Sequence, residues 1–361
     1  MKICLFADAQ SIHTVRWCNY FVDLGHDVHL ISFKYSEIES ITNHLIDVGD
    51  ISVRGGNWKV LLHFRKVKSV LNKLKPDVFH ALYATSYGIT GALCNFHPFV
   101  ITALGSDVLI SPFHSKIIKF LLKWSFKRAD WITSMADHMT LKINTLVEQY
   151  EKVTTLPFGI DTSLFYEKHT RDDISNQFIL ISTRNFEQVY NIHHLIYAYY
   201  KIIYIMPNSK LILIGDGTQR VELENLVKEL GLSNHIEFKG KVKQIEIADA
   251  LNQAHVFISV SKSDGNNISL NEAMACGTFC IATSIPANTQ WIEDSKNGFL
   301  VEIDEVEELA TKLLISYNDY YDLQDRAQII NREIISQKAD WNKNMSSVII
   351  NYERLIKSKR S

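Results

Sequence analysis

The sequence has no hydrophobic run long enough to cross a membrane, and it is poor in cysteine. A membrane-spanning helix needs roughly 20 consecutive apolar residues, which no segment supplies. The 361 residues include five cysteines: Cys4, Cys18, Cys94, Cys276 and Cys280. They are odd in number and lack the paired spacing of a zinc site, so we expect reduced thiols that pack in a core.

The sequence also lacks a large excess of either charge and the familiar motifs for binding nucleotides or metals. The net charge is −2, so nothing global favours nucleic acid as a partner. The turn "FADAQS" lacks the Gly-x-Gly-x-x-Gly of dinucleotide-binding dehydrogenases. No Asp-x-Asp follows a strand, so we expect no metal clamp. The opening "MKICLFADAQ" turns polar too early for a secretory signal, so we expect a cytoplasmic protein.

Short apolar runs alternate with segments of helical period along most of the chain. This alternation is typical of βαβ units and predicts parallel, doubly wound sheets. The runs expected to form strands are "KICLFA", "HDVHLISF", "DVFHAL", "PFVITAL", "DWITSM", "FILIST", "KLILIG", "HIEFKG", "VFISVS", "TFCIATS" and "GFLVEI".

The length of the chain suggests two domains rather than one. Residues 166–176 are polar, without apolar periodicity, and are expected to link two series of βα units. We therefore predict Rossmann-like domains over 1–165 and 166–340. A final helix at 341–361 is expected to pack back on the first domain.

The second series contains two carboxylates in a suggestive setting, "SKSDGNNISLNEAMACG" at 261–277. Asp264 follows the strand "VFISVS" in a Gly/Asn loop, and Glu272 stands on the helix that comes next. A carboxylate can accept two hydroxyl hydrogen bonds, and a helix start attracts an anion, so the segment suits a sugar linked to a diphosphate. The alternative is a capped surface helix with no ligand.

The chain resembles retaining glycosyltransferases of the family 4 type, which have the two-domain GT-B fold. Their mark is a pair of acids with seven residues between them, here with Asp264 in place of the first Glu. Other matching stretches are "LGHDV" (24–28), "KPDVFHA" (75–81), "GSDV" (105–108), "LPFGIDTSLF" (156–165), "GDG" (215–217) and "NGFLV" (297–301). The resemblance implies a donor and acceptor cleft between the two domains.

The resemblance also implies roles for individual residues. Asp264 should bind the hydroxyls of the donor sugar, and Glu272 should bind the ribose. Arg184, in "STRNFE", should neutralise the donor diphosphate, with a plain surface arginine as the alternative. Further donor contacts are expected from Gly265, Asn266, Asn267, Ser269, Gly215, Gly217, Tyr190 and Val242.

The chain departs from the family pattern where a Lys-Gly pair usually follows the arginine. Tyr190-Asn191 stands there instead, so one diphosphate cation is missing. A lysine from "FKGKVKQ" (Lys239, Lys241 or Lys243) is one substitute, with a solvated turn as the alternative.

Candidates in the first domain are tied to the acceptor side of the cleft. The family often has a Gly-Gly pair in its first loop, where this chain has "DAQSIHTVRW". Asp107 is expected to position donor or acceptor, with a helix N-cap as the alternative. His13 has the alternative of a helix-start residue without contact. The acceptor-side candidates are Ser11, His13, Arg16, Tyr83 and Gly105.

The expected reaction moves a hexose or N-acetylhexosamine from a nucleotide-diphosphate sugar to an acceptor hydroxyl, with retention of configuration. The resemblance implies no metal or other cofactor, and a glycan or lipid-linked acceptor in cell-surface polysaccharide or glycolipid synthesis. The alternatives are a non-hydrolysing nucleotide-sugar 2-epimerase and an inactive nucleotide-sugar-binding partner protein.

Lysines recur at helical spacing in "HSKIIKFLLKWSFKRADW" (114–131). Lys116, Lys119, Lys123 and Lys127 are predicted to form one stripe. Such a stripe could hold the protein on the anionic inner face of a membrane. The alternative is a solvated helix surface.

Overall fold

The computed structural model describes residues 1–49, 58–147, 150–168 and 177–360, and the chain forms two compact units. The first comprises Met1–Pro157 and Met345–Ser361, and the second comprises Phe158–Asn344. Most of the expected linker lies outside the described residues. Tyr166 and Lys168, just before that gap, are hydrogen-bonded to Asn252 of the second unit.

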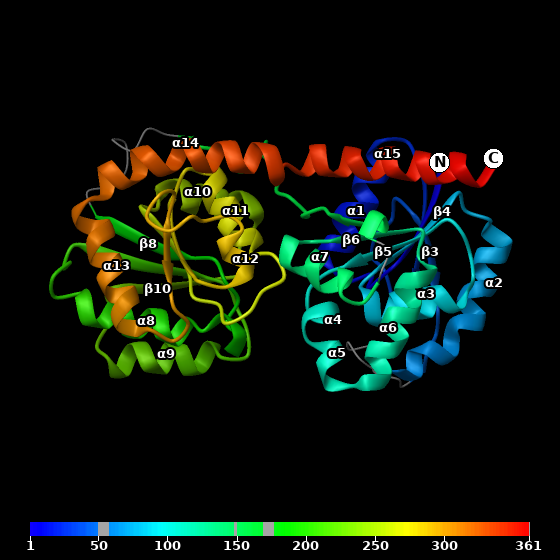
Figure 1. The fold of residues 1–361 in the computed structure, drawn as a ribbon. Helices are drawn as coiled ribbons and strands as arrows, with labels where there is room; N and C mark the ends of the chain where they lie inside the picture. Colours follow the sequence, from blue (N-terminus) through cyan, green and yellow to red (C-terminus); the bar gives the residue numbers. More distant parts are fainter. Residues whose placement is uncertain (50–57, 148–149, 169–176, 361) are drawn as a thin grey trace. The chain divides into compact units, whose positions relative to one another are not determined.

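The first unit is built on a parallel seven-stranded sheet of order β3-β2-β1-β4-β5-β6-β7. Figure 1 shows its helices packed around this sheet. The strands are β1 (Lys2–Phe6), β2 (Asp27–Ser32), β3 (Thr42–Leu45), β4 (Val78–Leu82), β5 (Phe99–Ala103), β6 (Trp131–Ser134) and β7 (Val153–Thr155). The helices are α1 (Ile12–Asp23), α2 (Phe64–Leu74), α3 (Thr90–Leu93), α4 (Ser106–Leu109), α5 (Ser111–His114), α6 (Lys116–Arg128) and α7 (Asp137–Asn144).

The last helix, α15 (Trp341–Arg360), is fixed to the first unit by a buried polar chain. The hydroxyl of Tyr352 lies 2.5 Å from Nδ1 of His80, whose Nε2 lies 2.6 Å from the hydroxyl of Thr102. Thr102 in turn bonds to Thr133 on the next strand. This series of hydrogen bonds therefore links α15 to side chains on the neighbouring strands β4, β5 and β6. None of these side chains is charged at neutral pH.

The buried His80 predicts that the stability of the protein depends on pH. Burial lowers the pKa of His80 to about 3, from 6.5 for an ordinary histidine. Between pH 6.5 and 3, His80 is therefore protonated in the unfolded state and neutral in the folded state. Its contribution to the free energy of unfolding is complete above pH 6.5 and is lost progressively as the pH falls towards 3.

We expect His80→Gln to destabilise the protein by roughly 1–3 kcal/mol at pH 7.5, since Tyr352 and Thr102 lose a buried partner. The difference in the free energy of unfolding between wild type and variant should be smaller at pH 5. At that pH the wild type loses stability through protonation of unfolded His80, and glutamine does not titrate. Urea unfolding at both pH values measures this. A difference that stays constant between them would contradict the assignment.

The second unit has a parallel six-stranded sheet of order β10-β9-β8-β11-β12-β13. Its strands are β8 (Phe178–Ser182), β9 (Ser209–Ile214), β10 (Ile236–Gly240), β11 (Val256–Ser259), β12 (Phe279–Thr283) and β13 (Phe299–Val301). Its helices are α8 (Ile192–Ile202), α9 (Arg220–Glu229), α10 (Gln244–Gln253), α11 (Ile268–Ala275), α12 (Pro286–Thr289), α13 (Val306–Asn318) and α14 (Tyr320–Lys338).

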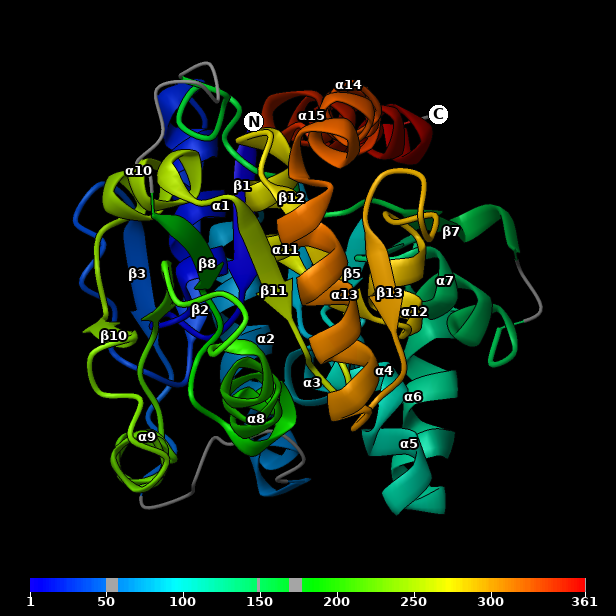
Figure 2. The ribbon, with the colours of Figure 1, turned by 90° about the vertical axis from the view of Figure 1, so that its left-hand side faces the viewer.

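Alternate residues of these strands bury their side chains on opposite faces of the sheet. Leu211 and Leu213 of β9 belong to one apolar core, and Ile212 and Ile214 belong to the other. Figures 1 and 2 show α8, α9 and α13 on one side and α10, α11 and α12 on the other. A strand buried on both faces reads as a continuous apolar run, which is why the sequence revealed these strands.

The two parallel α/β sheets confirm the predicted doubly wound fold. All five cysteines are buried thiols outside any disulfide, as expected for thiols that pack in a core. Within the described residues, no helix combines the length and the apolar character that a membrane span requires.

Candidate functional site

The second sheet reverses its strand order between β8 and β11. In an open parallel sheet, this switch point opens a crevice at the carboxyl ends of the strands, where ligands bind. The loop after β8 carries Arg184, and the loop after β11 carries Asp264. The fold thus brings together two predicted site residues that are 80 positions apart in the sequence.

Arg184 is held by two neighbours on the loop after β11. One terminal nitrogen lies 2.5 Å from Oδ2 of Asp264, and the other donates to Oδ1 of Asn267 at 2.9 Å. The arginine is 7% exposed, and its Nε has no hydrogen-bond partner among the described residues. The guanidinium is therefore a buried, oriented cation whose donors are only partly used. This favours the site over the plain surface arginine.

Asn267 is fully buried, and its side chain is bonded within the protein. Its Oδ1 accepts from Arg184 and from the backbone N–H of Leu270, so the residue caps α11. Its Nδ2 donates to Ser259 and Asn288. The side chain has no capacity left for a ligand, and we now assign it to positioning Arg184.

Tyr190 stands where the family lysine is missing, and its ring lies against Arg184. The guanidinium carbon is 4.2 Å from the ring centre, within cation–π range. The next residue, Asn191, adopts a left-handed conformation at φ 60° and precedes α8. Tyr190 therefore contributes a surface that fixes Arg184 and no charge of its own.

Gly215 and Gly217 let the turn after β9 pack onto the loop that carries Arg184. A Cβ on Gly215 would lie 2.5 Å from the carbonyl oxygen of Arg184, and one on Gly217 would lie 2.4 Å from that of Phe186. The backbone N–H of Phe186 also donates to the carbonyl of Asp216. The two glycines thus act through the backbone behind Arg184.

The remaining donor-side candidates lie on three loops or helices of this unit. Asp264 is about one-sixth exposed, with 16% of its side chain accessible, and its Oδ1 accepts no bond from the described residues. Asn266 accepts from the indole N–H of Trp291 at 3.1 Å. The other candidates are partly buried: Gly265 in the loop, Ser269 and Glu272 on α11, and Val242 beyond β10.

Asp107 of the first unit is fully buried, and backbone groups occupy its carboxylate. Oδ2 accepts from the N–H of Ala84 at 2.6 Å, and Oδ1 accepts from those of Leu104 and Gly105. Burial raises the pKa of this carboxyl, and these hydrogen bonds oppose the rise. The arrangement favours a structural role for Asp107, which fixes the loops after β4 and β5, but it is not the expected N-cap, because Gly105 is the N-cap of α4.

The loops that Asp107 fixes hold two acceptor-side candidates in strained backbone. Tyr83 has φ 91°, and Gly105 has φ 146°. The Tyr83 hydroxyl lies 3.0 Å from that of Ser106, so these two loops meet at their tips. Burial raises the pKa of Tyr83, which therefore stays protonated at neutral pH.

The other acceptor-side candidates lie at the start of α1. Ser11 is its N-cap residue, but its side chain makes no cap hydrogen bond. Burial and the nearby Arg16 lower the pKa of His13 to about 4, so this imidazole is neutral at physiological pH. Ser11 follows β1 and Tyr83 follows β4, the pair of strands at the switch point of the first sheet.

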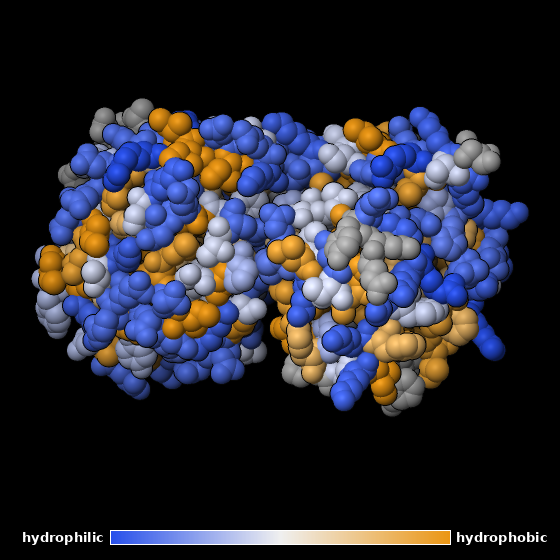
Figure 3. All heavy atoms as spheres, viewed as in Figure 1, coloured by the Kyte–Doolittle hydropathy of each residue, from blue (hydrophilic) through white to orange (hydrophobic). Residues whose placement is uncertain are grey.

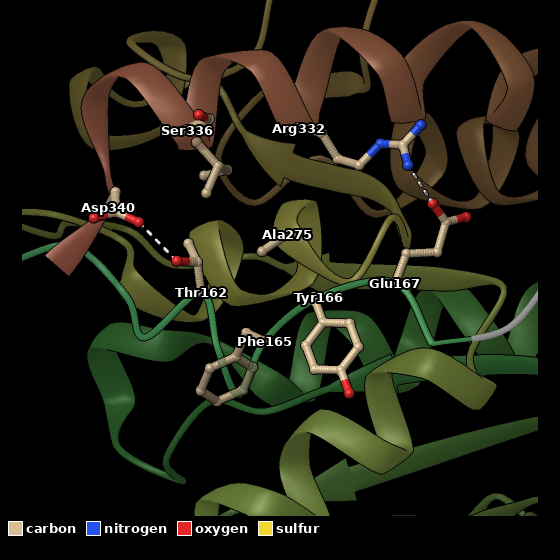
Figure 4. Close-up of a pocket in the computed structure, with 9 residues that line it drawn as sticks. Thr162, Phe165, Tyr166, Glu167, Ala275, Arg332, Ser336 and Asp340 are labelled. Atoms are coloured by element: carbon tan, nitrogen blue, oxygen red, sulfur yellow. Dashed lines mark hydrogen bonds and ion pairs between the residues drawn. The ribbon is translucent and has the colours of Figure 1, made fainter. Parts of the chain in front are cut away.

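One pocket of the second unit contains no predicted site residue (Figure 4). It measures about 290 Å³ and lies between the 162–167 segment, the last turn of α11 and α14. Its polar groups pair with one another, Arg332 with Glu167 at 2.9 Å and Thr162 with Asp340 at 2.6 Å. It lies at the opposite end of α11 from Asn267.

No described group of three or more His, Cys, Asp or Glu side chains is arranged to hold a metal ion. The described site consists of one buried cation, one partly exposed carboxylate and the start of a helix. Chemically, such a site can bind a phosphate group through Arg184 and a polyol through Asp264.

Comparison with known proteins gives two family matches. Residues 2–136 match the family described as Glycosyl transferase 4-like, and residues 167–334 match Glycosyl transferases group 1. N-acetyl-alpha-D-glucosaminyl L-malate synthase of Bacillus anthracis is 25% identical over 87% of this chain and 88% of its own length. Alpha-monoglucosyldiacylglycerol synthase of Acholeplasma laidlawii is 25% identical over 78% of each chain.

Solved structures share the fold over nearly the whole chain. Sucrose-phosphate synthase from Thermosynechococcus elongatus has a TM-score of 0.83 at 17% identity and covers 99% of this chain and 100% of its own. HepE from Anabaena, solved with UDP-glucose, has a TM-score of 0.79 at 20% identity, with coverages of 98% and 100%. The two family matches and the two parallel sheets identify the chain as a glycosyltransferase of the GT-B type.

Proposed function

We propose that this chain transfers a hexose or N-acetylhexosamine from a nucleotide-diphosphate sugar to an acceptor hydroxyl, with retention at the anomeric carbon. The observation that carries the proposal is the Arg184–Asp264 pair at the switch point of the second sheet. One solved protein of this fold, HepE, was crystallised with UDP, with UDP and glucose, and with UDP-glucose, which supports a nucleotide sugar as donor.

Arg184 would stabilise the leaving group in this reaction. As the bond between the anomeric carbon and the phosphate oxygen breaks, negative charge grows on the diphosphate. A buried guanidinium that is already oriented stabilises that charge without reorganising during the step. The terminal N–H groups of Arg184 that Asp264 and Asn267 do not occupy would supply the hydrogen bonds.

Asp264 and Glu272 would hold the two sugars of the donor. Oδ1 of Asp264 can accept from a hydroxyl of the transferred sugar while Oδ2 keeps Arg184 in place. The acceptor oxygen then bonds to the anomeric carbon, and the departing phosphate oxygen takes its proton. This scheme needs no separate general base and no metal.

The proposal is tested by incubating the protein in EDTA with UDP-, GDP- and ADP-sugars and candidate acceptors. We expect one donor to be consumed, and the anomeric coupling constant of the product in NMR to match that of the donor. Inversion of the anomer, or activity that returns only with Mn²⁺ or Mg²⁺, would contradict the mechanism. Donor binding without transfer would indicate a binding protein.

We further propose that α6 brings the first unit to an anionic membrane that carries the acceptor. Lys116 and Lys119 are exposed on this helix, and Ile117 and Phe120 between and beside them are 72% and 68% exposed. Apolar side chains that project beside lysines suit a lipid interface. There the apolar side chains enter the boundary of the acyl chains, and the lysines contact anionic head groups.

The apolar surface extends to the preceding turn. Phe113 of α5 is 64% exposed, and the Lys142 ammonium lies 4.2 Å from its ring centre. Figure 3 shows hydrophobic residues gathered where α5 and α6 lie in the same view as Figure 1. Of the other lysines in the predicted stripe, Lys127 is exposed and Lys123 is partly buried. The surface is therefore a mixed apolar and basic patch rather than a pure lysine stripe.

Vesicle sedimentation tests this contact. We expect Lys116→Glu/Lys119→Glu to weaken binding to anionic vesicles by roughly 2 kcal/mol, about 1 kcal/mol per lysine, and high salt to weaken the wild type. Phe120→Ser should weaken it without changing the salt dependence. The matched control is Lys68→Glu/Lys73→Glu on α2, also exposed. Equal loss in the control, or no sedimentation of wild type at low salt, would favour a water-soluble acceptor.

A further inference from the structure

The charges at the candidate donor site do not balance those of a diphosphate. Arg184 is the buried cation there, and Asp264 lies 2.5 Å from it, so the two formal charges cancel. A diphosphate leaving group brings at least two further negative charges into a partly buried crevice. Because Tyr190-Asn191 replaces the family's Lys-Gly, the loop after β8 offers no second cation. Another part of the chain has to supply it.

Lys262 is a cation on the loop that also carries Asp264. It stands two residues before Asp264 in the loop after β11, and its backbone N–H donates to the carbonyl of Val189 at 2.8 Å. Val189 is adjacent to Tyr190, whose ring packs on Arg184. This backbone bond joins the loops after β8 and β11 beside the position that the family lysine occupies.

The side chain of Lys262 forms a partly exposed ion pair with Asp304. Its ammonium lies 2.8 Å from Asp304, and the two side chains are 38% and 46% exposed. A half-exposed ion pair contributes little to stability, because water screens both charges. A hydrogen bond to a multiply charged diphosphate is stronger, so the ammonium would exchange one partner for the other. The long, flexible stem of lysine permits that movement.

Asp304 also has partners that would remain if Lys262 left it. The Asn191 side chain donates to its Oδ1 at 3.0 Å, and Nε2 of His194 lies 3.3 Å from the same oxygen. Both residues stand at the start of α8. Asp304 would therefore stay hydrogen-bonded after losing the ammonium, which lowers the cost of the exchange. Asn191 Oδ1 is buried and has no partner among the described residues.

We propose that Lys262 is the second cation for the donor diphosphate, held by Asp304 and transferred to the diphosphate as it binds. This inference rests on the proposed function. It assigns to the loop after β11 a role that the loop after β8 has lost. It also places the compensating charge on a residue that the family motif does not include.

Calorimetric titration with UDP, GDP or ADP, whichever binds best, tests the inference against the matching monophosphate. We expect Lys262→Met to weaken diphosphate binding about tenfold and monophosphate binding less, since one charge-assisted bond is lost. Asp304→Asn should tighten diphosphate binding by releasing Lys262. Asn tolerates the left-handed backbone of residue 304, at φ 66°. In the double variant, the effect of Asp304→Asn should disappear.

Two comparisons separate this inference from the proposed function. If wild type binds no diphosphate, the proposed function fails and Lys262 fails with it. If wild type binds and Arg184→Ala weakens binding, but Lys262→Met matches wild type, then Lys262 alone is overturned. Lys201→Met is the matched control, because Lys201 also forms an exposed ion pair, with Glu307 at 2.6 Å. Lys241→Met tests the other candidate cation, and a larger loss there than in Lys262→Met would assign the second cation to the loop beyond β10 and contradict the proposal.

Discussion

Arg184→Ala is expected to lower kcat/KM for sugar transfer by about 10²–10³-fold, the usual loss when one preorganised stabiliser of a developing anion is removed. The loss should fall mainly on kcat, because Arg184 meets most of its charge as the leaving group departs. Steady-state kinetics with the donor identified from the nucleotide-sugar panel measures it. Arg184→Lys should recover only part of the rate, because an ammonium is a point charge without the planar fork that reaches Asp264, Asn267 and phosphate from separate nitrogens.

Arg332→Ala provides the matched control for this prediction. Arg332 is also an arginine in an ion pair with a glutamate of the second unit, but its side chain is half exposed and it lines the pocket at the far end of α11. We expect it to retain wild-type kinetics. A folded Arg184→Ala protein with wild-type kcat would remove Arg184 from the reaction. Thermal melts of both variants establish that they are folded.

Gly215→Ala is expected to destabilise the second unit by roughly 3 kcal/mol or more. The new Cβ would lie 2.5 Å from the carbonyl oxygen of Arg184, and the backbone at φ 152° is one that alanine rarely adopts. Strained backbone and an overpacked contact each cost about 1–3 kcal/mol. Since the clash is with the residue that carries the guanidinium, nucleotide binding should weaken even in molecules that remain folded.

Gly231→Ala separates the clash from the loss of glycine itself. Gly231 also has a positive φ, 71°, but a Cβ there meets nothing within 4 Å. It should lower stability by the backbone strain alone and leave nucleotide affinity unchanged. Urea unfolding and calorimetric titration of both variants provide the comparison. Equal losses of stability would mean that packing of the 215–217 turn behind Arg184 contributes nothing.

The sequence predicted strands well wherever both faces of a strand are buried. The run "KLILIG" forms β9, whose residues Leu211–Ile214 alternate between two cores. It did not predict β3, Thr42–Leu45, which is polar and largely exposed at the edge of the first sheet. Such a strand is defined by its parallel pairing with β2, and no periodic pattern signals that pairing.

The sequence suggested candidate site residues, but not the contacts that they make with one another. The resemblance indicated Arg184 and Asp264, but not that the two form one ion pair. Asn267 was expected to contact the donor through its loop N–H, but the sequence did not indicate that its side chain caps α11 and holds Arg184. The Lys262–Asp304 contact joins the loops after β11 and β13, so neither local spacing nor the family motif indicates it.

The central claim is that the donor diphosphate binds at Arg184, at the switch point of the second sheet. A crystal structure of the protein with the tightest-binding nucleoside diphosphate, grown in EDTA, tests it most directly. We expect diphosphate oxygens at hydrogen-bond distance, about 2.7–3.2 Å, from the guanidinium of Arg184, with the ribose beside Glu272 on α11. A diphosphate bound elsewhere, for example in the pocket beside Arg332, with Arg184 still bonded only to Asp264 and Asn267, would contradict the account.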